Sequence, residues 1–268
     1  MAEHFYATVI RSTGSWYEVL HDGERLQCRI RGKLRLKGVR STNPVVVGDV
    51  VRVEPDEQGG YVISAIEQRR NYIIRRASNL SKESHIIAAN VDQALLVATL
   101  FSPETATEFI DRFLVTCEAY KVPVTILLAK IDLARTQPEA VEEFHAIYES
   151  AGYRIIEVSA TEGEGVDEVR ELLRGKTTLL SGNSGVGKST LVAAVEPGLD
   201  IRTGEISQSH HKGKHTTTFS TMYPLSDGGY IIDTPGIKGF GLIDIEDAEQ
   251  RHEALRQLPR PAQRRLLR

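Results

Sequence analysis

Cysteine is scarce in this chain of 268 residues, which contains only Cys28 and Cys117. Two thiols cannot complete a zinc site or a disulfide framework, so we expect two reduced core residues and no zinc in this chain.

Long apolar runs are also missing. No stretch approaches the ~18 uncharged apolar residues of a membrane span, because Asn90, Asp92 and Gln93 interrupt the best candidate. An early acid at the N-terminus and the lack of an apolar signal segment complete the prediction of a cytoplasmic protein without membrane contact.

Positive charge is concentrated near the N-terminus, although the net charge is −3. Residues 1–80 contain 13 Lys and Arg against 9 Asp and Glu, whereas the remainder contains 20 against 27. Six basic residues fall within 29–40, almost all at alternate positions, so on a strand they would share one face and could follow a phosphate backbone. Few aromatic residues interleave with them, which favours phosphate or shape recognition over base stacking. A solvated edge strand guarded by charge is the alternative interpretation.

Turn residues divide the first part of the chain into five short alternating segments. The expected strands are Phe5–Arg11, Trp16–Leu20, Arg25–Arg31, Val45–Val53 and Tyr61–Ile66. Five strands without a helical period predict a small barrel, and we favour an OB-type barrel over an SH3-like one. We therefore divide the chain into an RNA-binding OB-type β-barrel (1–70), a basic linker (71–84), an α/β domain (85–245) and a short basic tail (246–268).

From residue 85 onward, strands and helices alternate, which predicts a parallel sheet covered on both faces. The buried strand Gln93–Leu100 is followed by a helix, for which we expect Ser102 as the N-cap and Pro103 as the first residue. Cys117 falls on the apolar face of that helix, which is a core position. The remaining expected elements are the strands Val122–Ala129, Tyr153–Val158 and Gly229–Asp233 and the helices Pro138–Ser150 and Val166–Leu173.

The strongest motif is a phosphate-binding loop. Residues 182–189 read G-x-x-x-x-G-K-S between an apolar strand, Thr177–Leu180, and a helix, Ser189–Val195. Its glycines let backbone N–H groups turn toward a phosphate, Lys188 reaches the terminal phosphates, and the Ser189 hydroxyl can ligate Mg²⁺. The nucleotide-binding residues expected here are Gly182, Asn183, Ser184, Gly185, Val186, Gly187, Lys188, Ser189 and Thr190.

Two motifs after this loop predict a magnesium-bound triphosphate. Asp233-Thr234-Pro235-Gly236 follows an apolar strand, so Asp233 is placed to hold Mg²⁺ through water, and Gly236 can donate its N–H to a γ-phosphate. Earlier, His215 is followed by three threonines, of which we take Thr217 as the residue that binds Mg²⁺ only while the γ-phosphate is present.

Two motifs before the loop predict that the base is guanine. Ala129, Lys130, Ile131 and Asp132 form one, and Ser159 and Ala160 form the other at the end of the next strand. The Asp132 carboxylate can accept hydrogen bonds from guanine N1 and N2, which adenine cannot offer, while the Lys130 stem covers the base. GTPases usually place these motifs after the phosphate loop. The reversed order predicts a circular permutation, in which the sheet and pocket are kept and the termini are moved.

In its barrel and these motifs, the chain resembles the circularly permuted GTPases. Among them it resembles the ribosome small-subunit-dependent GTPase A family, and the resemblance covers residues 1 to about 245. The resemblance implies an α/β fold, a circularly permuted P-loop GTPase domain preceded by an OB-type β-barrel. It implies GTP as substrate, Mg²⁺ as cofactor, and hydrolysis stimulated by the small ribosomal subunit during its late maturation, with contact to its rRNA. We expect a monomer.

The chain departs from the family's pattern at the base motif and at the C-terminus. Ala129 replaces the usual asparagine, so one amide contact is missing, and we expect weaker GTP binding with guanine preference retained by Asp132. For the family's C-terminal zinc-binding domain, built on cysteines and a histidine, we expect no counterpart in this chain.

The catalytic residues that we predict are Lys188, His215 and Gly236. Ile237 stands where many GTPases have the glutamine that orients the attacking water, a substitution that the family shares, so His215 is the candidate for this role. Two other interpretations of that histidine are a loop residue without a catalytic role and a metal cluster with His210 and His211.

Two alternative functions are a hydrolysis-deficient GTP-binding protein that binds rRNA, and a small-molecule P-loop kinase. The kinase would need a substrate lid and an acceptor site, and no motif in the sequence supplies either.

Overall fold

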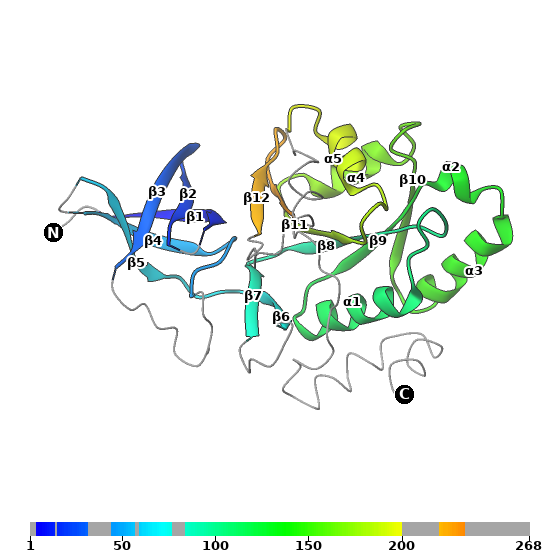
Figure 1. Ribbon diagram of the computed structural model, residues 1–268, viewed down its shortest axis with the longest axis horizontal. Coiled ribbons are helices and arrows are strands. Elements are labelled where there is room, and N and C mark those ends of the chain that lie inside the picture. The colour runs from blue at the N-terminus through cyan, green and yellow to red at the C-terminus, as the bar shows by residue number, and fades with distance from the viewer. Residues whose placement is uncertain are drawn as a thin grey trace, which may run out of the picture.

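The computed structural model describes residues 4–13, 15–31, 44–56, 59–76, 84–199 and 220–233. They form a β-barrel and an α/β domain, which lie side by side (Figure 1). Within these ranges no helix combines the length and the apolar character needed to cross a bilayer.

The first five strands close into a barrel. They are β1 (Phe5–Ser12), β2 (Tyr17–His21), β3 (Glu24–Ile30), β4 (Val50–Pro55) and β5 (Tyr61–Ile66). Neighbours pair in the order β1-β2-β3-β5-β4, and β1 also pairs with β4, with β3 and β5 parallel. This closed five-stranded barrel confirms the expected OB type. Alternate residues of the strands point inward, and Cys28 lies among them as a buried free thiol. Burial raises its pKa to about 11.

The fourth strand begins later than expected, at Val50 instead of Val45. Val45, Val46 and Val47 are buried without belonging to a strand. They lead into a turn at Gly48, whose φ is +85° and where a Cβ would lie 2.0 Å from the carbonyl oxygen of Ala89. Only glycine fits this close approach. Of the three valines, Val45 packs in the barrel core, whereas Val46 packs with Ile86 and Ala89 and Val47 joins the core of the α/β domain.

The α/β domain is built on six strands. They are β8 (Gln93–Ala98), β9 (Val124–Ala129), β10 (Arg154–Val158), β11 (Thr177–Gly182), β12 (Thr221–Pro224) and β13 (Tyr230–Asp233). Their order is β10-β9-β8-β11-β13-β12, and all pairs are parallel except β12 with β13. The carboxyl ends of β8, β9, β10, β11 and β13 therefore meet at one edge, where ligands of open α/β sheets bind. The antiparallel strand β12 was not predicted.

Helices cover both faces of this sheet (Figure 1). They are α1 (Thr107–Ala119), α2 (Ile131–Ala134), α3 (Pro138–Glu149), α4 (Val166–Leu173) and α5 (Lys188–Val195). The apolar residues of α1 and α3 share one buried cluster with Leu96, and those of α4 and α5 share another with Leu95. Successive residues of β8 thus point to opposite faces, as expected for a sheet buried on both sides. Cys117 of α1 is a buried free thiol, as predicted.

The segment after β8 differs from the prediction that Ser102 caps a helix. α1 begins at Thr107, and no side chain caps its first turn. Ser102 instead lies five residues before the start of α1 with a φ of +52°, and Pro103 lies in a loop before the helix. The Ser-Pro signal marks a tight turn here, since the chain must fold back beside the phosphate loop before α1 can start.

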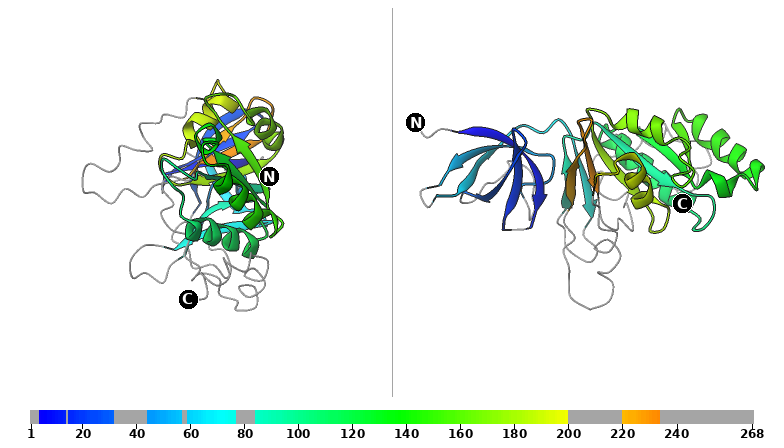
Figure 2. Two further views of the ribbon diagram at one scale, coloured as in Figure 1. Left: turned by 90° about the vertical axis from the view of Figure 1, so that its right-hand side faces the viewer. Right: turned by 90° about the horizontal axis from the view of Figure 1, so that it is seen from above.

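Structured chain joins the two domains. Residues 72–76, at the start of the expected basic linker, form β6 (Tyr72–Arg76), which pairs with β7 (Ser84–Ala89). A second junction pairs β1 with β12 at Arg11 and Thr221, at the boundary that Figure 2 shows. The barrel therefore extends the edge of the α/β sheet.

A buried ion pair stabilises this junction. Arg69 donates from Nε and Nη2 to the two carboxylate oxygens of Asp49, at 2.6 and 2.7 Å, and also to the carbonyl of Pro44. Both side chains are buried, at 8% and 0% exposed. The Asn90 amide donates to the Gly48 carbonyl at 2.9 Å from the α/β side. Removing one partner of such a buried ion pair lowers the free energy of unfolding by several kcal/mol, so this pair stabilises the junction.

Candidate functional site

The phosphate loop begins where β11 ends and finishes where α5 begins. Gly182 has a φ of +150°, and a Cβ at this position would lie 2.5 Å from the carbonyl oxygen of Val97 on β8. Glycine is therefore required for the loop to leave the sheet here. Gly187 precedes α5 in a left-handed conformation, so the N-terminus of α5 faces the loop. The strand–loop–helix order is the one that the motif predicts, and it directs backbone N–H groups toward a bound anion.

Lys188 lies across the loop that it belongs to. Its ammonium donates to the carbonyls of Gly182 and Asn183, both at 2.7 Å. Burial lowers the pKa of Lys188 from its usual value, while the negative charge of Asp233 acts in the opposite direction. The cation is thus positioned inside the loop, within the field of the carboxylate that ends β13.

Two residues near Lys188 carry oxygen donors, namely Ser189 and Asp233. Asp233 is the last residue of β13 and pairs in register with Leu180 of β11, and its side chain is buried at 8% exposure. Ser189 lies in the first turn of α5 and is partly exposed. A hydroxyl and a carboxylate next to a phosphate loop are the hard oxygen donors that Mg²⁺ prefers, so the residues present fit this ion.

The base motif contacts the phosphate loop directly. Lys130, at the end of β9, has a φ of +57°, and its ammonium donates to the carbonyl of Gly185 at 2.8 Å and to that of Ser102 at 2.5 Å. Asp132 follows in the first turn of α2 and is partly exposed. The structure therefore brings the 129–132 motif and the 182–190 loop together, although more than fifty residues separate them.

The second base motif forms a tight turn after β10. Ser159 is buried and its N–H donates to the carbonyl of Glu164 at 3.0 Å, while its hydroxyl accepts from the N–H of Glu162 at 3.4 Å. Arg135, at the end of α2, forms an ion pair with Glu164. This pair ties the two base motifs to one another. Sequence reasoning missed it, because residues this far apart carry no local pattern.

Three predicted site residues, His215, Thr217 and Gly236, lie outside the described residues, as do His210, His211 and Ile237. Within the ranges that the structure describes, no group of three His, Cys, Asp or Glu side chains is arranged to hold a metal. Of the predicted phosphate and metal residues, those of the loop 182–190, which include Lys188 and Ser189, and Asp233 lie within the described residues.

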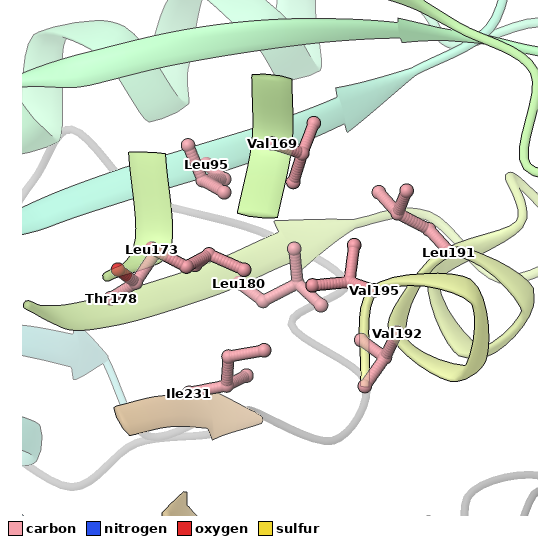
Figure 3. Close-up of a pocket in the computed structure, with 9 residues that line it drawn as sticks. All are labelled: Leu95, Val169, Leu173, Thr178, Leu180, Leu191, Val192, Val195 and Ile231. Atoms are coloured by element: carbon pink, nitrogen blue, oxygen red, sulfur yellow. The ribbon is translucent and has the colours of Figure 1, made fainter. Parts of the chain in front are cut away.

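An apolar cavity lies beneath α5 and is distinct from the phosphate loop (Figure 3). Its volume is about 10 Å³, and Leu95, Leu180 and Leu191 are among the residues that line it. A space of this size holds at most one water, so it is a packing gap of the core and not a nucleotide site.

Comparison with known proteins identifies the arrangement. A family model described as RsgA GTPase matches residues 66–243, and one described as RsgA N-terminal domain matches residues 7–63. The chain belongs to the RsgA GTPase family. One relative is the small ribosomal subunit biogenesis GTPase RsgA of Bacteroides fragilis, which is 56% identical over 247 residues. These residues make up 91% of this chain and 79% of that protein. The protein of the same name from Christiangramia forsetii is 51% identical over 247 residues, 90% of this chain and 78% of that one.

Solved structures agree with the RsgA assignment. YjeQ from Thermotoga maritima matches with a TM-score of 0.68 at 34% identity, over 89% of this chain and 77% of that one. YloQ, described as a circularly permuted GTPase, matches with a TM-score of 0.62 at 26% identity, over 91% and 75%. The permuted GTPase fold and the family expected from the sequence are thereby confirmed, and as an RsgA GTPase the chain is a GTP hydrolase.

Proposed function

We propose that this chain hydrolyses GTP during maturation of the small ribosomal subunit, as the names of its relatives state for them. The observation that carries the proposal is the contact between Lys130 and the carbonyl of Gly185. This contact joins a base motif to a phosphate loop in permuted chain order. Asp132 follows Lys130 closely, in the first turn of α2. A pocket that combines these two motifs suits a guanine nucleotide.

Magnesium belongs to this proposal as the cofactor. Ser189 and Thr217 would bind it directly, and Asp233 would hold it through water. When bound, the ion offsets the charge on the β- and γ-phosphates. Lys188 adds positive charge on the same phosphates, and the N–H groups of the loop and of Gly236 orient them. A buried, desolvated ammonium interacts more strongly with phosphate than an exposed one would, which is consistent with the surroundings of Lys188.

His215 is the proposed group for orienting the attacking water, because the apolar side chain of Ile237 cannot do so. We expect His215→Ala to lower the turnover number by about tenfold to a hundredfold while leaving the GDP dissociation constant nearly unchanged. Single-turnover hydrolysis measured beside GDP binding separates the two effects. Equal losses in both would assign His215 to binding instead.

The barrel is the proposed rRNA-contacting part. Arg29, the first basic residue of the 29–40 segment, lies with Cζ 4.1 Å from the ring centroid of Trp16. Trp16 is 41% exposed, and Tyr61 and Tyr6 are also exposed on the barrel. The sequence alone favoured phosphate contacts without stacking. The exposed Trp16–Arg29 pair adds a flat cationic surface on which an unpaired base can stack.

Subunit-dependent turnover tests the proposal. The experiment measures hydrolysis of GTP, ATP and GDP with and without purified small ribosomal subunits. We also propose that the chain acts as a cytoplasmic monomer. We expect slow GTP hydrolysis alone and a clear stimulation by subunits. Subunit binding that is independent of nucleotide and without turnover would contradict it, as would phosphate transfer to a metabolite.

A further inference from the structure

The loop between β8 and α1 is closed by two buried threonines. Thr99 and Thr105 are 2% and 5% exposed. The N–H of Thr99 donates to Thr105 Oγ1 at 3.0 Å, and the N–H of Thr105 donates to the Thr99 carbonyl at 2.8 Å. The Thr99 hydroxyl donates to the carbonyl of Pro103 at 2.5 Å. We call this hydrogen-bonded set, formed by Thr99, Pro103 and Thr105, the threonine latch.

The tip of the latched loop lies against the phosphate loop. A Cβ placed on Gly185 would be 3.4 Å from Cδ and 3.6 Å from Cγ of Pro103, which is van der Waals distance. The carbonyls of Ser102 and Gly185 both accept from the Lys130 ammonium. One cation therefore joins three segments, namely the latched loop, the base motif and the phosphate loop.

The backbone at this junction is held in an unusual conformation. Ser102 and Lys130, which are joined by their hydrogen bond, both have positive φ, at +52° and +57°. A non-glycine residue in this region is strained and persists only where its surroundings enforce it. The latch supplies that constraint for Ser102, because it fixes residues on both sides of the turn.

We propose that the threonine latch positions the phosphate loop for nucleotide binding. The hydrogen bonds from Lys130 to the carbonyls of Ser102 and Gly185, and the packing of Pro103 on Gly185, link the latched loop to the phosphate loop. Thr99 and Thr105 are thus positioning residues that act through Lys130 and Pro103. This inference rests on the proposed function, in that the nucleotide occupies this pocket.

Hydroxyl removal within the latch tests the proposal. Thr105→Val and Thr99→Val should each weaken GDP about fivefold to tenfold, the scale of one lost hydrogen bond. Thr99→Ser keeps the hydroxyl and should restore affinity. The matched control is Thr116→Val, a buried threonine of α1 whose hydroxyl bonds only within its helix, to Arg112, and which should leave GDP affinity unchanged.

Two readouts separate positioning from general stability. The nucleotide-free melting temperature reports folding, and the affinity for inosine diphosphate, which lacks the guanine 2-amino group, reports base selectivity. The latch acts on the phosphate loop, so both nucleotides should weaken by the same factor. A fall for GDP alone, or an equal loss in the Thr116→Val control, overturns the proposal.

Pro103→Ala gives a second test at an exposed residue of the latch. We expect GDP binding to weaken at least about threefold, because the substitution removes the ring that packs against Gly185 and frees the backbone conformation that proline fixes. Pro123→Ala, an exposed proline before β9, is the control and should have no effect. If the parent chain binds GDP and Pro103→Ala and Thr105→Val bind it equally well, the latch proposal fails alone. If the parent chain binds no nucleotide, the proposed function fails with it.

Discussion

Restoring asparagine at position 129 should tighten nucleotide binding. Ala129 ends β9, is 7% exposed, and belongs to the same buried cluster as Val186 of the phosphate loop. An amide here lies next to the loop and adds a second link beside that of Lys130. One buried hydrogen bond contributes about 1–2 kcal/mol when its partner is fixed, so we expect GDP to bind about 5- to 30-fold more tightly in Ala129→Asn.

Isothermal titration of GDP measures this change, and Ala129→Leu is the control. Leucine has nearly the shape of asparagine but no polar atoms, so a gain with asparagine and none with leucine assigns the effect to hydrogen bonding. The amide also has a cost if it finds no partner, about 1–3 kcal/mol, which would appear as a lower melting temperature. Unchanged or weaker GDP binding in Ala129→Asn would refute the reasoning that the missing amide limits affinity.

Three further predictions concern the loop and the domain junction. GDP affinity should fall as the pH rises through the lowered pKa of Lys188, because phosphate binds the charged form of the side chain. GDP titrations from pH 7 to 10 measure this fall, which should be smaller in Lys188→Arg because arginine stays charged. Gly182→Ala should lower the free energy of unfolding by about 2–4 kcal/mol and abolish GDP binding, since its Cβ meets the Val97 carbonyl; urea unfolding and titration check both. Arg69→Met should cost about 3–5 kcal/mol at pH 7.5 by leaving Asp49 buried alone. Burial raises the pKa of Asp49, so this loss should shrink in acid, where the carboxyl becomes neutral, and urea unfolding at pH 5 tests the sign.

Local sequence signals predicted the elements that define the fold. The helix Val166–Leu173 has the expected bounds, and the phosphate loop lies between a strand and a helix, as its glycines and Lys188 indicated. These signals work because apolar periodicity and glycine positions act over a few residues.

Features that depend on distant partners were not predictable. Val45–Val47 resemble a strand, but Val46 and Val47 pack toward the α/β domain next to Gly48, where the Ala89 carbonyl leaves no room for a Cβ. Ser102 and Pro103 resemble a helix start, yet Lys130 and Gly185 hold them in a loop. In each case tertiary contacts override a local preference. The roles assigned to His215, Thr217 and Gly236 stay predictions.

Asp132 is the residue that we propose to recognise guanine, in a pocket completed by the phosphate loop. Asp132→Asn replaces the acceptor with an amide that can also donate, and xanthine carries an oxygen where guanine carries its 2-amino group. Competitive binding of guanosine and xanthosine diphosphates measures the preference directly. We expect Asp132→Asn to lose affinity for the guanine nucleotide and to gain it for the xanthine nucleotide, while Asp92→Asn, at the opposite end of the sheet, changes neither affinity. Retained guanine preference in Asp132→Asn would show that Asp132 does not recognise the base.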